Sequence, residues 1–189
     1  MSYNRGDYLQ KWRIERLAAG IRGDLGLDQL TPLSPWHLAD AIPAHIFFPE
    51  DFDDDALARR VRAVKWDGFA FPCPDDHTLM IVLNPAKPQT RQTATLMEEL
   101  SHHLLHHQPS SIAHDPRTGF LERSYNRSQE DEAYDLGAAL LLPKERIQQD
   151  VAARLTAAQI AVDHSCSDDI VVYRIKRMRL WQRYATYAA

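Results

Sequence analysis

Residues 98–102 read Glu98-Glu99-Leu100-Ser101-His102, within a segment, 93–107, that contains neither proline nor glycine. We expect residues 93–107 to form a helix of about four turns, with Gln89 or Thr90 as its cap. Residues four apart share one face of a helix, so Glu98 and His102 can bind a single metal ion, while Glu99 projects about 100° around the axis. This segment therefore predicts a helix that carries a metal site.

The elements on either side of this helix predict an α+β fold. Apolar runs between turn signals predict strands at 44–48, 68–71 and 78–83, the last two as a β-hairpin, and an acidic run favours a helix at 56–64. Residues 130–142 predict another long helix, ended by Pro143. We expect one domain, with N-terminal helices in 1–43, a core with a small antiparallel or mixed sheet in 44–143, and a C-terminal helical pair in 144–189.

Composition is typical of a globular protein without a strong overall charge. The 189 residues are 44% hydrophobic, and 22 basic against 26 acidic residues give a net charge of −4, which provides no field to attract nucleic acid or an anionic membrane. No stretch approaches the roughly 18 apolar residues of a membrane span, and no apolar segment follows the polar start. We therefore expect a soluble, cytoplasmic protein.

The histidine content also points to a metal. Four of the nine histidines fall within six residues, at His102, His103, His106 and His107, and such a tract suggests metal binding. Glu98 and His102 need a third ligand from another element. Glu130, at the start of the next long helix, is the first candidate, and Glu132 is the second.

Other ligand sets fit the same helix. His106 lies one turn beyond His102, so it could extend the stripe formed by Glu98 and His102. Glu99 and His103 could instead bind the ion in a second register, which His107 continues. The simplest alternative is that His103, His106 and His107 form a polar helix end, where histidine is favoured. His114 and Tyr125, in the polar stretch 108–128, are candidates to reach a substrate carbonyl.

Several separated segments resemble the ImmA/IrrE family of metallo-endopeptidases. In that family a strand ending in asparagine precedes an Arg-x-Arg-Phe-Thr approach, then HELGH, and later Glu-x-x-Ala-Asn-x-Phe-Ala-x-x-Leu-Leu-x-Pro. The corresponding segments here are Ile81-Val82-Leu83-Asn84, Arg91-Gln92-Thr93-Ala94-Thr95, Glu98-Glu99-Leu100-Ser101-His102 and Glu130-Asp131-Glu132-Ala133-Tyr134-Asp135-Leu136-Gly137-Ala138-Ala139-Leu140-Leu141-Leu142-Pro143. The resemblance covers most of the chain and implies a zincin-like metallopeptidase fold.

Carried over by position, the resemblance implies that Glu99 is the general base, that His102 is a zinc ligand and that Glu130 is the third ligand. The chain departs from the family where Ala94 replaces phenylalanine, Ser101 replaces glycine and Glu98 replaces the first histidine ligand. Family members often cleave or bind a helix-turn-helix repressor and so control stress, phage or mobile-element genes. The resemblance therefore implies a regulatory protein of that type as substrate or partner.

Glu98 changes the metal site itself. Glutamate can ligate zinc at about 2.0–2.2 Å, but two carboxylates and one imidazole cancel the formal charge of a divalent ion. A less positive metal centre lowers the pKa of its bound water less. Oxygen-rich ligation also shifts the preference of the site toward manganese or magnesium. We expect weaker zinc binding and slower hydrolysis than in a relative with two histidines. The alternative is a pseudo-peptidase that holds no metal and binds its partner without cutting it.

The C-terminal segment has a second pattern. Residues 155–161 and 171–180 flank a turn at 165–167 with helix-turn-helix proportions. Because Asp168 and Asp169 would repel phosphate, we expect a structural helical pair with a solvated basic face, and no direct contact with nucleic acid; DNA binding is the alternative. The basic residues of this segment are Arg174, Lys176, Arg177, Arg179 and Arg183.

Overall fold

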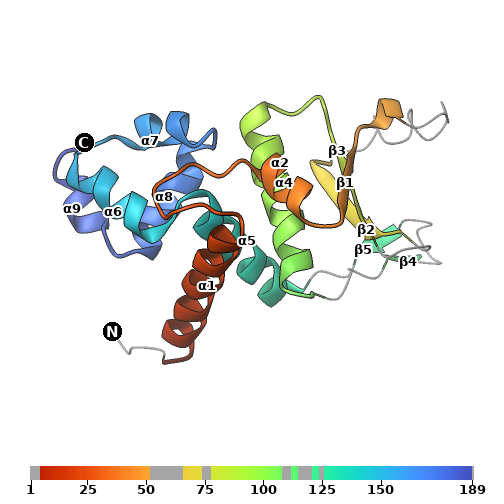
Figure 1. Ribbon diagram of the computed structural model, residues 1–189, viewed down its shortest axis with the longest axis horizontal. Helices are drawn as coiled ribbons and strands as arrows, with labels where there is room; N and C mark the ends of the chain where they lie inside the picture. The colour runs from red at the N-terminus through yellow and green to blue at the C-terminus, as the bar shows by residue number, and fades with distance from the viewer. Residues whose placement is uncertain are drawn as a thin grey trace.

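The computed structural model describes residues 5–51, 66–73, 78–107, 112–114, 121–123 and 126–188 (Figure 1). The predicted helix at 56–64 and Tyr125 lie outside these residues, as does the side chain of His114. In chain order the elements are α1 (Arg5–Asp24), α2 (Pro35–Ala41), β1 (Ala44–Phe47), the 3-10 turn η1 (Pro49–Asp51), β2 (Gly68–Pro72), β3 (Leu79–Leu83), α4 (Gln89–Leu104), β4 (Ile112–His114), β5 (Leu121–Arg123), α5 (Arg127–Leu141), α6 (Lys144–Ala152), α7 (Ala157–Asp163), α8 (Asp168–Arg177) and α9 (Trp181–Ala185).

Three strands form a small mixed sheet in the order β1, β3, β2. β2 and β3 are antiparallel, which confirms the predicted hairpin, whereas β1 runs parallel to β3 and pairs Ala44 with Leu79. Ile81, Val82 and Leu83 of the central strand are at most 1% exposed, which explains their unbroken apolar run. β4 and β5 form a separate antiparallel pair. The expected α+β fold with a small mixed sheet is confirmed.

Helix α4 lies between this sheet and α5 (Figure 1). Its buried side chains include Leu96, Met97 and Leu100, at helical spacing, and they belong to the same core as Leu136 and Leu140 of α5. The helix begins about one turn earlier than predicted, directly after Pro88, and ends at Leu104 rather than at 107. No side chain caps its N-terminus, so the expected cap is wrong.

Two glycines allow neighbouring elements to approach α4 closely. A Cβ added to Gly68 of β2 would lie 2.6 Å from Cγ2 of Thr95, and one added to Gly137 of α5 would lie 3.1 Å from Cγ of Met97 and 3.3 Å from Oγ of Ser101. Contacts of this length are shorter than ordinary van der Waals distances. The absence of a side chain at Gly68 and Gly137 thus allows β2 and α5 to pack directly against α4.

Five helices in the described part of the chain end in the same turn. A residue with φ between 50° and 70° follows the helix: Gly26, His106, Arg154, Ser165 and Arg179. The next residue donates its backbone N–H to a carbonyl five positions earlier; these donors are Leu27, His107, Leu155, Cys166 and Leu180. This is the Schellman motif, in which glycine usually occupies the left-handed position and the residue after it packs back against the last turn of the helix.

The C-terminal region contains the predicted pair as α7 and α8, and two further helices, α6 and α9, within 144–189. Two of its basic residues are not on a solvated face, so that expectation is wrong for them. Arg174 is 1% exposed and pairs with Glu15 of α1 at 2.7 Å, and Arg177 pairs with Asp135 of α5 at 2.5 Å. No helix among the described residues has both the length and the apolar character that crossing a membrane requires.

Candidate metal centre

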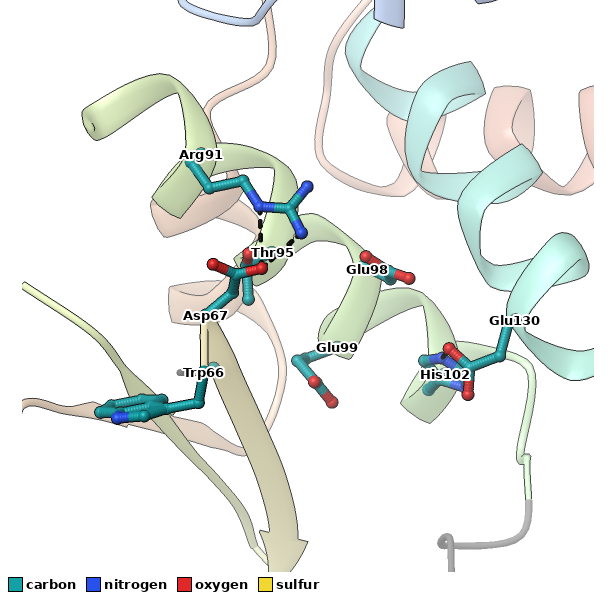
Figure 2. Close-up of a pocket in the computed structure, with 9 residues that line it drawn as sticks. Trp66, Asp67, Arg91, Thr95, Glu98, Glu99, His102 and Glu130 are labelled. Atoms are coloured by element: carbon teal, nitrogen blue, oxygen red, sulfur yellow. Dashed lines mark hydrogen bonds and ion pairs between the residues drawn. The ribbon is translucent and has the colours of Figure 1, made fainter. Parts of the chain in front are cut away.

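Three polar side chains of α4 lie together on the part of the helix that is turned away from its buried apolar face. Leu96, Met97 and Leu100 fix the face that points into the core, and this leaves Glu98, Glu99 and His102 on the opposite side. Figure 2 shows Glu98 on the side of the helix that faces Glu130, with Glu99 turned toward β2. Glu98 therefore shares the side of α4 toward Glu130, and Glu99 lies on a neighbouring side of the helix.

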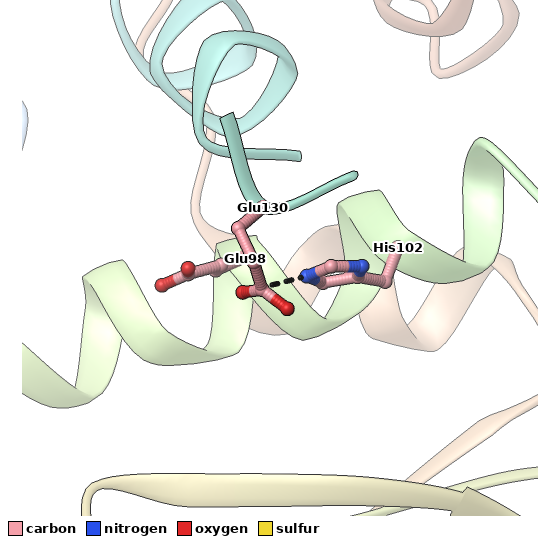
Figure 3. Close-up of side chains that lie close together, drawn as sticks. All are labelled: Glu98, His102 and Glu130. Atoms are coloured by element: carbon pink, nitrogen blue, oxygen red, sulfur yellow. Dashed lines mark ion pairs between the residues drawn. The ribbon is translucent and has the colours of Figure 1, made fainter. Parts of the chain in front are cut away.

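The three predicted ligands come together from two helices. One donor atom each of Glu98, His102 and Glu130 lie within 4.8 Å of one another, and Nε2 of His102 lies 3.5 Å from Oε2 of Glu130 (Figure 3). Two atoms that bind a tetrahedral ion at about 2.1 Å lie roughly 3.4 Å apart. The His102–Glu130 pair lies near that separation, and all three donor types suit a divalent ion; metal binding by the group stays a prediction.

The N-terminus of α5 places Glu130. The side chain of Asn126 caps this helix by accepting hydrogen bonds from the backbone N–H groups of Ser128 and Gln129. Glu130 lies in the first turn, where a carboxylate is favoured by the helix dipole. Its side chain and that of His102 are 18% and 19% exposed, so the pair is partly shielded from water and still accessible.

Glu132, the second candidate for third ligand, makes other contacts. Its Oε2 lies 3.3 Å from Nε2 of His107, and its Oε1 lies 3.4 Å from Arg13 of α1. The group of donor atoms that the structure brings together includes Glu130 and not Glu132.

The other histidines of the tract do not extend the stripe of Glu98 and His102. His106 is exposed and has a φ of 54°, beyond the end of α4, so it does not continue the helical spacing. The turn there brings His107 against His102, with their Nδ1 atoms 2.9 Å apart. His103 is partly buried, and this burial together with the neighbouring His106 lowers its pKa.

A cleft of about 340 Å³ lies beside the candidate ligands. It is lined by Trp66, Asp67, Gly68, Arg91, Thr95, Glu98, Glu99, His102 and Glu130 (Figure 2). Asp67 accepts hydrogen bonds from Arg91 at 2.5 Å and pairs with Lys87 at 2.8 Å, and these cations hold the pKa of Asp67 below its ordinary value. One wall of the cleft is thus the start of β2, fixed to the first turns of α4.

Sequence reasoning did not identify Trp66 and Asp67. The signal that could have found them is Asn84, which directly follows β3. Its side chain donates to the carbonyl of Trp66 at 2.9 Å, and its backbone N–H donates to the carbonyl of Asp67 at 3.0 Å. Asn84 and Arg91, two positions on which the family resemblance depends, therefore hold the strand that forms the wall.

Comparison with known proteins gives the same family as the resemblance. The IrrE N-terminal-like domain family matches residues 50–176, about two thirds of the chain. No curated protein matches the chain. The matched range contains β2, β3, α4, α5 and every side chain of the candidate site. The chain belongs to the IrrE N-terminal-like domain family, a family of metallopeptidases.

Proposed function

We propose that the protein is a metal-dependent endopeptidase in which Glu98, His102 and Glu130 hold the ion and Glu99 is the general base. The observation that carries the proposal is the convergence of those three donors from α4 and α5 within 4.8 Å, beside a cleft. Family membership independently implies a metallopeptidase.

The donor set suits a divalent ion. A zinc ion held there would polarise the scissile carbonyl and activate water for attack. Because Glu98 contributes a second carboxylate where relatives have imidazole, the site carries less net positive charge once loaded, and manganese becomes a competitor for it.

Glu99 lines the cleft without belonging to the donor group. From that position its carboxylate can take a proton from the attacking water and pass it to the leaving amine of the cut peptide. Arg91, Trp66 and the start of β2 line the same cleft. β2 is one of the two edge strands of the sheet formed by the described residues, and it is the one beside the cleft, so an extended peptide could pair with its outer edge.

The substrate follows from the resemblance to the ImmA/IrrE family. A helix-turn-helix repressor that controls stress, phage or mobile-element genes is the protein that we propose is cut. The cleft is lined mostly by polar and charged groups, which suits one extended segment of a specific partner more than general digestion.

The second candidate is a pseudo-peptidase that binds the same kind of partner and does not cut it. Glu98 is the observation that favours it, because this residue replaces an imidazole ligand of the family pattern. A decayed site would keep the cleft and the fold while losing the ion.

One comparison distinguishes the two candidates. Metal content and cleavage of a repressor encoded near the gene should be measured for the wild type, Glu99→Gln and Glu98→His. A peptidase requires that the wild type cleaves, that Glu99→Gln retains metal and loses cleavage, and that Glu98→His binds zinc more tightly. Cleavage by Glu98→His together with no cleavage by the wild type would establish the pseudo-peptidase.

A further inference from the structure

We propose that His107 and Glu132 form a histidine relay with His102, which orients the His102 ring and fixes its tautomer for metal binding. The inference rests on the proposed metal site and adds two positioning residues to it. It is carried by the hydrogen bonds that lead from the candidate ligand to a carboxylate on α5.

The turn at the end of α4 creates the first contact of the relay. In the Schellman motif the residue after the left-handed position packs against the helix residue five positions earlier. For α4 these residues are His107 and His102, whose backbones are joined by a 3.0 Å hydrogen bond from N–H to carbonyl. Their rings meet edge to face with centroids 5.0 Å apart.

The other helices that end in this turn show that a histidine is unusual at the position of His107. The equivalent residues of α1, α6, α7 and α8 are Leu27, Leu155, Cys166 and Leu180. An apolar side chain is the usual occupant of this position, because it packs onto the last helical turn. Among the five described helices that end in this turn, α4 alone holds there a side chain that can form strong hydrogen bonds.

The relay admits one arrangement of protons when Nε2 of His102 binds a metal. Nε2 of His102 faces Glu130 at 3.5 Å and must then be unprotonated, so Nδ1 of His102 carries the hydrogen. Nδ1 of His107, 2.9 Å away, must accept that hydrogen bond. Nε2 of His107 therefore carries its own hydrogen and donates it to Oε2 of Glu132, at 3.3 Å.

Each contact in the relay thus fixes the next. The chain ends on a carboxylate, which is the group that most strongly favours a donated N–H. The His107 side chain is 7% exposed and that of Glu132 is 16% exposed, so water competes weakly for these bonds. Histidine ligands usually donate their second N–H to a carboxylate or carbonyl; here a second histidine carries that function to Glu132.

Helix α5 contributes to both ends of the site. Glu130 faces the metal-binding nitrogen of His102, and Glu132, two residues later, receives the far end of the relay. Any shift of α5 along α4 would change both contacts together. The relay therefore couples the orientation of His102 to the packing of the two helices.

The inference is tested by zinc affinity and by the visible spectrum of the cobalt-loaded protein. His107→Leu should weaken zinc binding about 10- to 100-fold in competition with a chromophoric chelator, because loss of such a partner typically has that effect on a metal site. It should also change the cobalt absorption bands, which report ligand geometry. Glu132→Gln should show a smaller loss in the same direction, because a neutral amide oxygen accepts the hydrogen bond more weakly.

The matched control is His103→Leu, which removes the histidine next to the ligand but from a different side of α4. It should leave the zinc affinity within about twofold of wild type. Circular dichroism of the metal-free proteins checks folding, and Glu132→Gln carries the test if His107→Leu fails to fold. Equal affinities in wild type and His107→Leu, or equal losses in His107→Leu and His103→Leu, would overturn the relay. Absence of zinc, cobalt and manganese binding in the wild type would instead refute the proposed function.

Discussion

Gly68→Ala should destabilise the protein by about 2 kcal/mol, because it forces β2 away from α4. The new Cβ would lie 2.6 Å from Cγ2 of Thr95, about 0.8 Å closer than ordinary contact, and 3.1 Å from the backbone carbonyl of Val82. Thr95 is β-branched, helical and only 5% exposed, so its side chain has few positions into which it can move. Overpacking costs about 1–3 kcal/mol, and a 2.6 Å contact belongs at the upper end of that range; the gain from replacing a strand glycine offsets roughly 0.5–1 kcal/mol, which leaves about 2 kcal/mol.

A double-mutant cycle in urea, followed by circular dichroism, measures this clash. Thr95→Ser removes Cγ2, so the cost of Gly68→Ala in that background should fall by about 1–1.5 kcal/mol, within the usual range for residues in contact. Gly20→Ala is the matched control, because nothing lies within 4 Å of the position of its Cβ. That change should stabilise α1 by up to about 1 kcal/mol. Strictly additive costs for Gly68→Ala and Thr95→Ser would refute the reasoning.

Three further predictions concern buried groups. Arg22 is fully buried and donates to the carbonyls of Asp28, Thr31 and Leu140, so Arg22→Met should cost about 3 kcal/mol in urea unfolding; a cost below about 1 kcal/mol would contradict this. Burial lowers the pKa of His164 below its ordinary 6.5. As the pH falls, the unfolded chain therefore takes up a proton before the folded protein does, so the contribution of His164 to stability is full above pH 6.5 and is lost below it. His164→Gln should flatten that slope in unfolding measured from pH 7.5 to 5. Gly137→Ala should be at least about 0.5 kcal/mol less unfavourable in a Ser101→Ala background, because Ser101 Oγ would lie 3.3 Å from the new Cβ; an equal effect in both backgrounds would exclude this contact.

The helix and hairpin that build the site were predictable because their signals are local. The spacing of Glu98 and His102 fixes them on one face of any helix that contains both. The hairpin follows from two apolar runs with turn residues between them. Glu130 was predicted from the family resemblance and from its place at the start of a helix, and both depend on sequence order.

Helix ends were less predictable because their usual signal is absent. Glycine marks the left-handed position in most Schellman motifs, and α1 follows this rule with Gly26. At α4 the position is held by His106, a residue with a Cβ, which gives no warning that the helix stops. The predicted helix therefore runs on to 107, and His107 is placed one turn beyond His103 instead of against His102.

Long-range pairing explains the error about the basic segment. Charge counting treats Arg174 and Arg177 as members of one solvated face. Their carboxylate partners, Glu15 and Asp135, are 159 and 42 residues away in sequence. A count of charges within a segment contains no information about partners at that distance, so only the packing of α8 against α1 and α5 reveals them.

His107 also bears on the choice between an active site and a decayed one. In four other helices with the same turn the equivalent position holds an apolar residue, and burying an imidazole there has a cost that hydrogen bonds only partly offset. His107→Leu should therefore stabilise the metal-free protein by about 1 kcal/mol while it weakens zinc binding. A chain that had lost its metal would gain by that substitution, so a polar relay that reduces stability is expected only while His102 still binds an ion. Equal or lower stability of metal-free His107→Leu in urea would remove this argument.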